Sequence, residues 1–480
     1  MSTNMFEGEW SLPGGVKQPG RIVFDKDKKR IELQIFGAAY IEGELVKGNK
    51  PYYHPEHFHP IIYGDGQVEI TLYNCSWTGS DKLTNDLYQV NYKIGYLING
   101  IHLKTNGGQI RGGTFMFSHL STWFDGDLFL EKLKGDDAEF FDGSKMVKGA
   151  LTTDEIQVRQ DLKLILQDEV TTRIEQINIS NRTVFRKYVH FKYETDIPFQ
   201  QLLKDAVTFL KLLKFCFAKP LAHEIVAVHA DKGEKKLSYL WVSNYSLSKR
   251  IKLESFSVPS NHMLLYKSHR RPGEIGEIII KWFNNQQYYN IYEYYLDSND
   301  WFHGTGAMLS NVMFNNRFLN LVQGLEDYYR EFFETNTTAA DRQLFDERKK
   351  IIMDGIEDDA IRKWFNDSFR FSRYPSITQK LAAIVTDLRE DLNELFTGIS
   401  LEQFPATSSG FRNKLSHGQN KEINLGKDLH RDYYIAQVLL GVCILKTLGI
   451  DNLKTRVSRY MKFKDAAEQI RYYQENGENT

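Results

Sequence analysis

The residues best suited to chemistry lie near the C-terminal end, in the run Arg412-Asn413-Lys414-Leu415-Ser416-His417. Arginine stays charged and presents a planar set of N–H donors that fits a phosphate. Histidine exchanges a proton near neutral pH. Cutting RNA without a metal needs a proton taken from the 2′-hydroxyl, a proton given to the leaving 5′-oxygen, and electrostatic stabilisation of the phosphorane. Arg412 and His417 are the two residue types that this chemistry requires.

A structural interpretation competes with the catalytic one, in which Arg412 is a surface cation and His417 ends a helix before the capping residue Gly418. Asn413 precedes His417 by four residues, so the two share a helix face, and Asn413 can orient the imidazole or donate to a phosphate oxygen. Arg412 precedes His417 by five residues and does not quite share that face. Two facing copies of the motif relieve this mismatch, so the spacing favours a dimer.

Two further residues are candidates for supporting the motif. Glu326 either faces the motif and holds Arg412 or His417, or is a surface carboxylate paired with Arg330 at i+4. Because surface i,i+4 pairs are commonplace, the second interpretation is favoured. Lys414 is expected to be solvated and able to touch the RNA backbone.

The last predicted helix begins at Asn452, and its cations alternate with aromatic residues. Cations next to aromatic rings suit a single-stranded RNA loop, but a solvated face over a core stripe explains the same pattern equally well. The candidate RNA-binding residues are Arg456, Arg459 and Lys462.

One cluster has the composition of a metal site: His54, Glu56, His57 and His59. A zinc site needs three or four convergent ligands, and the flanking prolines indicate a loop. We therefore expect no metal and no cofactor.

Length and composition indicate a soluble globular protein of two or three domains, with 480 residues, 41% hydrophobic and 26% charged. The formal net charge of −1 excludes a global basic field, so any RNA contact must come from local patches. The N-terminus lacks an apolar signal region, and no apolar run is long enough for a membrane span. Three distant cysteines, Cys75, Cys216 and Cys443, indicate reduced thiols, and a cytoplasmic location is expected.

Hydrophobic periodicity changes from strand to helix along the chain. Strands dominate up to about residue 197, a helix is predicted over 199–217, and strands are predicted again over 224–228, 237–242 and 277–282. Helices follow, including 317–333, 341–353, 358–371, 376–396, 411–417 and 428–448, with a break over 404–410. We predict an α+β multidomain protein with β-rich subdomains at 1–195 and 196–302 and an all-α bundle at 303–480.

A helical bundle that carries Arg-Asn-x-x-x-His resembles the HEPN superfamily of ribonucleases, whose signature is Arg-x4–6-His, often with a polar residue after the arginine. Residues 317–326 look like the first bundle helix of the ApeA-like HEPN branch. Three N-terminal segments and a later one look like the ApeA N-terminal domain: residues 8–14, 19–22, 31–33 and 115–124. The resemblance covers nearly the whole chain in the right order.

The resemblance implies a metal-independent endoribonuclease of anti-phage abortive infection that cleaves tRNA anticodon loops. It implies Arg412, Asn413 and His417 as catalytic residues, an RNA substrate, and a homodimer or higher even oligomer without a membrane. The N-terminal region would sense a phage-derived trigger or restrain the nuclease. The alternative is a non-catalytic interaction protein, in which the bundle dimerises and the β-rich region binds a partner.

Overall fold

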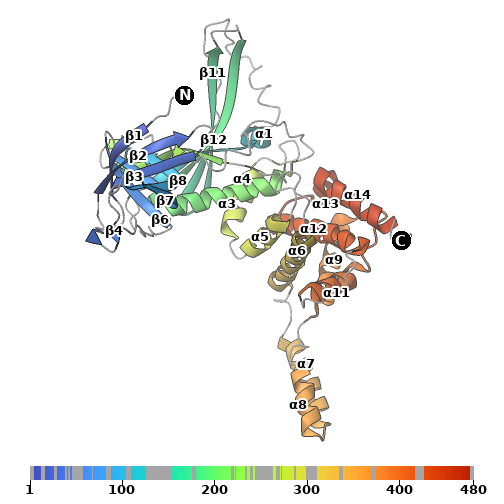
Figure 1. Ribbon diagram of the computed structural model, residues 1–480. Helices are drawn as coiled ribbons and strands as arrows, with labels where there is room; N and C mark the ends of the chain where they lie inside the picture. The colour runs from blue at the N-terminus through green and yellow to red at the C-terminus, as the bar shows by residue number, and fades with distance from the viewer. Residues whose placement is uncertain are drawn as a thin grey trace. The chain divides into compact units, whose positions relative to one another are not determined.

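We analysed a computed structural model of the chain, which folds into a β-rich part followed by a helical part (Figure 1). The structure describes residues 5–11, 17–25, 30–37, 40–41, 44–45, 58–66, 69–82, 88–103, 110–125, 153–175, 180–217, 221, 223–232, 235–237, 242–243, 263–265, 271, 273–285, 288–298, 311–333, 339–368, 375–416 and 426–475.

The first β structure is an antiparallel barrel. Its strand order is β8-β3-β2-β1-β6-β7, and a further pairing of β7 with β8 closes the sheet, with β15 added at the edge of β8. The strands are β1 Met5–Ser11, β2 Lys17–Asp25, β3 Arg30–Gly37, β6 Phe58–Asp65, β7 Glu69–Lys82, β8 Tyr88–Asn99 and β15 Val242–Ser243, while β4 Tyr40–Ile41 and β5 Glu44–Leu45 form a separate pair. Closure leaves few free strand edges.

Alternating side chains fill the barrel core. In β3 the residues Ile31, Leu33 and Ile35 are buried while their neighbours are partly exposed, as the period of two requires. Trp10 is buried among them, and Gly64 on the paired strand makes room for its ring, since a Cβ at Gly64 would lie 2.3 Å from Trp10 Cζ3. The interior is therefore packed with side chains.

The second sheet is also antiparallel, with the order β10-β11-β12-β9-β13-β14. Its strands are β9 Ile110–Phe117, β10 Thr153–Arg159, β11 Leu162–Glu175, β12 Ser180–Ile197, β13 His223–Lys232 and β14 Lys235–Leu237, and the short helix α1 (Leu120–Asp125) follows β9. The predicted helix over 199–217 is confirmed as α3 (Phe199–Phe217). Phe209 of α3 packs edge-on against Phe117 of β9, with centroids 4.9 Å apart.

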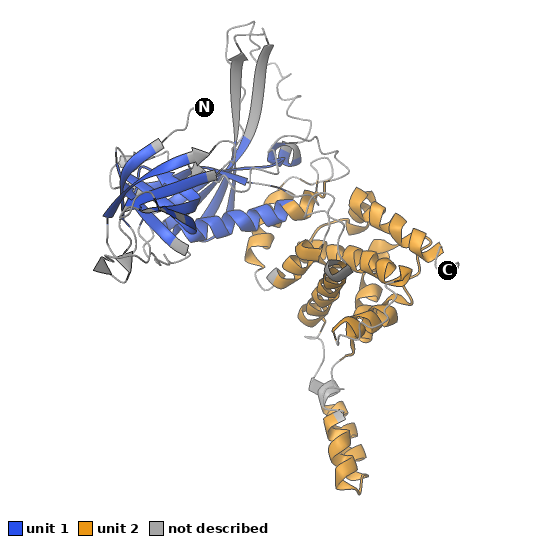
Figure 2. Ribbon diagram, in the orientation of Figure 1, with its two compact units in different colours: residues 1–213, 221–258 blue, residues 214–220, 259–480 orange. Residues whose placement is uncertain are grey.

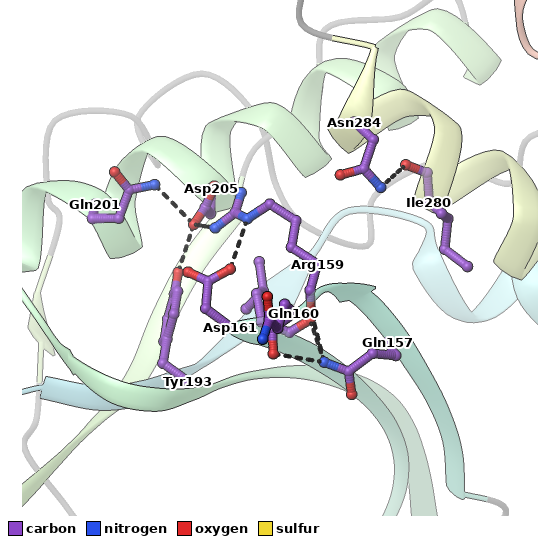
Figure 3. A network of polar contacts seen from close by, with 10 residues as sticks. Gln157, Arg159, Gln160, Asp161, Tyr193, Gln201, Asp205, Ile280 and Asn284 are labelled. Atoms are coloured by element: carbon purple, nitrogen blue, oxygen red, sulfur yellow. Dashed lines mark hydrogen bonds and ion pairs between the residues drawn. The ribbon is translucent and has the colours of Figure 1, made fainter.

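A polar network also attaches α3 to this sheet (Figure 3). The carboxylate of Asp205 in α3 is buried and accepts two hydrogen bonds from the guanidinium of Arg159, each of 2.9 Å. Tyr193 Oη and Gln201 Nε2 donate to the same carboxylate at 2.8 and 3.0 Å. The buried charge is thus paired and fully hydrogen-bonded, which is the condition under which such a group is tolerated.

The C-terminal part is helical, as predicted. Its helices are α4 Glu274–Asn284, α5 Tyr289–Ser298, α6 Asn311–Phe332, α7 Ala339–Asp354, α8 Asp359–Ser368, α9 Ile377–Asp387, α10 Arg389–Leu392, α11 Phe404–Ser416, α12 Lys427–Thr447, α13 Leu453–Arg459 and α14 Met461–Glu475. Helix α12 is buried over most of its length and packs against α5, α6, α11 and α14. The predicted Ser376 cap is present, because Ser376 and Gln379 form a capping box at the start of α9.

The chain divides into two compact units rather than three segments (Figure 2). Unit 1 comprises residues 1–213 and 221–258, and unit 2 comprises residues 214–220 and 259–480, so α3 crosses the boundary. The predicted β-rich subdomain at 196–302 does not form a unit of its own. Its strand β13 pairs with β9 in the second sheet of unit 1, whereas its last residues belong to unit 2.

The predicted strand over 277–282 is wrong, because these residues lie in helix α4. Ile278, Ile279, Trp282 and Phe283 are buried, which is a helical spacing. A short apolar run does not distinguish a buried strand from a buried helix. The tertiary contacts of unit 2 decide between them.

Candidate functional site

The motif residues that the structure describes lie on helix α11, which is longer than expected. The predicted break over 404–410 is instead the first part of this helix. Pro405 stands in the first turn, where the missing N–H costs nothing. Thr407 Oγ1 lies 3.0 Å from the carbonyl oxygen of Gln403, one turn earlier in the chain. Arg412 therefore follows two complete turns of helix.

The side chains of the motif differ in exposure. Arg412 is half-buried, whereas Asn413 and Lys414 are exposed. Helix α11 ends at Ser416, and His417 lies outside the described residues, together with Gly418. Arg412 is thus the motif residue whose surroundings the bundle defines, and Asn413 and Lys414 face solvent.

Arg412 has a buried acidic partner on another helix. Nε of Arg412 lies 3.4 Å from Oε1 of Glu326 in α6, and the side chain of Glu326 is only 9% exposed. Glu326 is thus not the surface carboxylate that the i,i+4 pattern favoured. Arg330 pairs instead with Asp327, at 3.1 Å. Of the two interpretations of Glu326, the structure supports the one in which it faces the motif.

This ion pair restricts the guanidinium of Arg412 to the neighbourhood of Glu326. A buried carboxylate is costly without a partner, so Glu326 attracts the cation strongly and limits the positions of its side chain. The guanidinium of Arg412 carries five N–H donors, so it can pair with Glu326 and still offer donors to a ligand. Two parallel N–H groups match two oxygens of a phosphate.

An aromatic contact fixes how α11 lies on α6. Phe411 packs edge-on against Phe318 of α6, with centroids 6.3 Å apart. Phe318 is fully buried. Since Phe411 precedes Arg412 directly, this contact fixes the rotation of α11 about its axis at the point where Arg412 leaves the helix.

A polar anchor, formed by Asp432 with Thr407 and Ser408, holds α11 against α12. Asp432 of α12 is fully buried, and its carboxylate accepts hydrogen bonds from Thr407 Oγ1 and from Ser408 Oγ, the latter at 2.9 Å. Arg431 donates to the same carboxylate from Nη2 at 3.0 Å. Burial raises the pKa of Asp432, and these donors act in the opposite direction. Ser408 lies one turn before Arg412, so the anchor holds the adjacent turn of the helix.

This anchor was not predicted from the sequence. Asp432 is a carboxylate within the apolar run of α12, and such a residue needs partners if it is buried. That signal was available in the sequence, but the identity of the partners was not. Thr407 and Ser408 lay in the segment that was predicted to be a break, where their hydroxyls would have faced solvent.

The three candidate RNA-binding residues differ in exposure: Arg459 is exposed, Lys462 is half-buried, and Arg456 lies in a buried ion pair. Nη2 of Arg456 donates to both carboxylate oxygens of Glu274 at 2.8 Å, and the two side chains are 11% and 3% exposed. Arg456 therefore connects α13 to the start of α4, and its Nη2 is engaged by Glu274. Arg459 is exposed. Lys462 is half-buried and lies 3.8 Å from Asp465.

The histidine cluster of the N-terminal region is not described, since His54, Glu56 and His57 and the side chain of His59 lie outside the described residues. Within the described part of the chain, no group of three or more potential metal ligands is found. All three cysteines are buried, and none forms a disulfide. Among the described helices, none combines the length and hydropathy that a membrane span requires.

Comparison with known families covers both parts of the chain. Residues 5–282 match the family model described as ApeA N-terminal domain 1, and residues 319–454 match the model described as Apea-like HEPN. No curated protein and no solved structure matches the chain significantly. The N-terminal match alone spans more than half of the sequence, and the second match contains Glu326, Arg412, His417 and Asp432. The chain belongs to the family of ApeA-like HEPN proteins.

Proposed function

We propose that this protein is a metal-independent endoribonuclease of anti-phage abortive infection, with the site centred on Arg412 and His417. The observation that supports the proposal is the buried Glu326 beside Arg412. A bundle that served only for dimerisation would have no need for a half-buried arginine oriented by a buried carboxylate next to a histidine. Membership of the ApeA-like HEPN family is consistent with a nuclease role in defence.

The proposed reaction is attack by the 2′-hydroxyl of RNA on the adjacent phosphate. His417 takes the proton of the 2′-hydroxyl, the new P–O bond forms, and the bond to the 5′-oxygen breaks. The leaving 5′-oxygen receives a proton, so the products are a 2′,3′-cyclic phosphate and a 5′-hydroxyl. Arg412 holds the phosphate and stabilises the negative charge of the phosphorane. Asn413 orients the imidazole or donates to a phosphate oxygen, and Lys414 contacts the RNA backbone.

The finer parts of the proposal concern substrate and assembly. The substrate is a tRNA, cut in its anticodon loop in the cytoplasm. The active form is a homodimer, because one copy supplies one imidazole and the reaction needs both a base and an acid. The N-terminal β-rich region senses a phage component or restrains the nuclease, since an unrestrained tRNA nuclease would kill its host.

The test is to express the wild type, Arg412→Ala and His417→Ala and to sequence the ends of cellular RNA. The expected result is toxicity with new 2′,3′-cyclic phosphate ends in tRNA for the wild type only. Loss of one charge-stabilising donor lowers a rate by about 10²–10³-fold. Purified wild-type protein should cleave tRNA equally well with and without a chelator. Equal toxicity without new RNA ends would favour the interaction protein, and a requirement for added zinc would favour a metal hydrolase.

A further inference from the structure

Helices α7 and α8 form a hairpin that is inserted between α6 and α9 of the bundle (Figure 1). Within the described part of unit 2, the main packing partner of each of the two helices is the other. The hairpin thus differs from α6, α9, α11 and α12, which pack against one another. Two helices of 16 and 10 residues have little intrinsic stability in water, so most of their stability must come from packing.

The hairpin exposes large apolar side chains that would normally lie in a core. On α7 they follow helical spacing and form one stripe, since positions 344, 351 and 352 lie on the same side of a helix. On α8 positions 361 and 364 are neighbours on the surface in the same way. We call these five residues the hairpin face: Leu344 45% exposed, Ile351 72%, Ile352 50%, Ile361 54% and Trp364 65%.

The exposed apolar area of the hairpin face is large enough for a binding surface. Soluble proteins expose single apolar residues commonly, but grouped ones indicate an interaction site. Summed over the two helices, the five side chains expose on the order of 500 Å² of mainly apolar surface, compared with the roughly 800 Å² that each partner contributes to a standard interface.

The charges around the hairpin face limit what can cover it. The acidic residues between positions 343 and 367 outnumber the basic ones, which disfavours RNA and anionic lipid as partners. Charges of the two signs are also separated along the hairpin. A basic run, Arg348-Lys349-Lys350, lies in α7, and an acidic run, Glu357-Asp358-Asp359, lies at the turn into α8.

This separation makes the hairpin complementary to itself. A two-fold axis brings residue i of one copy to residue j of the other and repeats the contact in reverse. If two hairpins cross with their apolar stripes in contact, the basic run of each can meet the acidic run of the other, twice in one interface. The resulting four-helix arrangement buries both apolar faces.

We propose that the hairpin face is the surface through which two copies of this chain pair, α7–α8 against α7–α8. The inference rests on the homodimer of the proposed function and names the surface that holds it together. Helices α6 and α9, which flank the hairpin in sequence, both pack against α11, the helix of Arg412. Pairing of the hairpins therefore places two copies of α11 in one assembly.

The first experiment measures the mass of the full-length protein by analytical ultracentrifugation over a range of concentrations, without RNA. Ile351→Glu and Trp364→Glu should each raise the dissociation constant of the dimer at least tenfold, because each puts a charge into the interface. Tyr472→Glu is the matched control, since Tyr472 is a 57% exposed apolar residue on α14 of the same unit. It should leave the dimer unchanged. A monomeric wild type at tens of micromolar, or a dimer that all three variants leave intact, would overturn the proposal.

The second experiment detects proximity without depending on a destabilising variant. The three native cysteines are buried. The thiol introduced by Ile361→Cys is therefore the one that a maleimide can reach. A short bismaleimide should link two copies of Ile361→Cys that carry different tags. A cysteine at position 226 on β13 of unit 1, Val226→Cys, should not be linked. Absence of a link at position 361 in a sample that sediments as a dimer would refute hairpin pairing. RNA cleavage by that same dimer would leave the nuclease proposal intact.

Discussion

The carboxylate of Glu326 in α6 lies 3.4 Å from Nε of Arg412 in α11, and Glu326 is almost completely buried. The pair joins two helices that are far apart in the sequence. Because Glu326 is shielded from solvent, its attraction for the guanidinium is screened less than the attraction within a surface ion pair. The arginine of the Arg-x4-His motif is therefore held in position by the bundle before any substrate arrives.

Glu326→Gln is expected to lower the kcat for RNA cleavage by roughly 10- to 100-fold, because a hydrogen bond or ion pair to a charged group contributes about 1.5–3 kcal/mol. The amide keeps the shape of the side chain but removes the charge that orients Arg412. KM should change less than kcat, since the terminal amino groups of Arg412 can still bind phosphate. Single-turnover kinetics on a purified tRNA would measure both.

Asp327→Asn is the control for this prediction. Asp327 is the adjacent residue on α6 and pairs with the exposed Arg330 instead of the motif. Its neutralisation should leave cleavage unchanged within about twofold, because its partner Arg330 is exposed and is not part of the motif. Equal losses in the two variants would mean that Glu326 acts through the stability of α6 and not through Arg412.

Asp432 should make the bundle less stable as the pH rises. Burial raises its pKa above the ordinary value of 3.8, so the folded state binds the proton more strongly than the unfolded state. The contribution of this group to stability is complete below pH 3.8 and declines as the pH rises through the raised pKa. Asp432→Asn does not titrate, so its unfolding temperature relative to the wild type should increase from pH 4 upward.

Calorimetric unfolding between pH 4 and pH 7 would test this dependence. Asp428→Asn is the control, because Asp428 is an exposed residue on the same helix that also pairs with Arg431. A constant difference between Asp432→Asn and the wild type over this range would contradict the prediction. Asp432→Asn should also cleave RNA more slowly, since an amide accepts less strongly from Thr407 and Ser408 on α11.

Arg456 and Arg459 should separate structure from RNA binding. Arg456→Ala leaves Glu274 buried without its cation and should cost about 3–5 kcal/mol of stability. Arg459→Ala should change stability by less than about 0.5 kcal/mol, as is usual for an exposed residue. Denaturant unfolding measures the first effect. A filter-binding assay with tRNA at several salt concentrations would show whether Arg459 contributes to affinity, and a fully stable Arg456→Ala would be inconsistent with the buried pair.

Unit 1 contains a histidine pair that should make it sensitive to mild acid. Thr114 Oγ1 lies 2.8 Å from Nδ1 of His190 and 2.9 Å from Nε2 of His229. A hydroxyl donates one hydrogen bond, so it can donate to one ring and accept from the other when both rings are neutral. Burial lowers the pKa of both histidines, and the proximity of His229 lowers that of His190 further.

The sign of the effect follows from these lowered pKa values. The unfolded state binds protons more strongly, so the stabilising contribution is complete above pH 6.5 and is lost as the pH falls toward the lowered pKa values. The unfolding temperature of unit 1 should therefore decrease below pH 6.5. His229→Gln stays neutral and can still form a hydrogen bond with Thr114. The unfolding temperature of this variant should therefore fall less steeply with decreasing pH than that of the wild type. Identical slopes for the variant and the wild type would argue against the pair as its source.

Much of the architecture could be predicted from local patterns. The strand-rich start, the helix over 199–217 and the helical C-terminal part follow from periodicity, and the Ser376 cap follows from residues three positions apart. Such features depend on neighbours within one or two turns, which the sequence lists directly. The Arg-x4-His motif and the resemblance to ApeA-like HEPN proteins are also contained in the order of the residues, and the family matches confirm that resemblance.

The tertiary structure decided the features that depend on distant partners. The run 277–282 is a helix, and 404–410 begins α11, because packing and side-chain partners in unit 2 outweigh local propensity. The pairs Glu326–Arg412, Asp432–Ser408 and Glu274–Arg456 join residues from different helices, so no spacing rule could reveal them. The sequence alone determined which chemical groups the protein carries. Only the fold decided that Glu326 is buried beside Arg412 and that Arg456 is paired with Glu274, because burial and pairing arise when separate helices pack together.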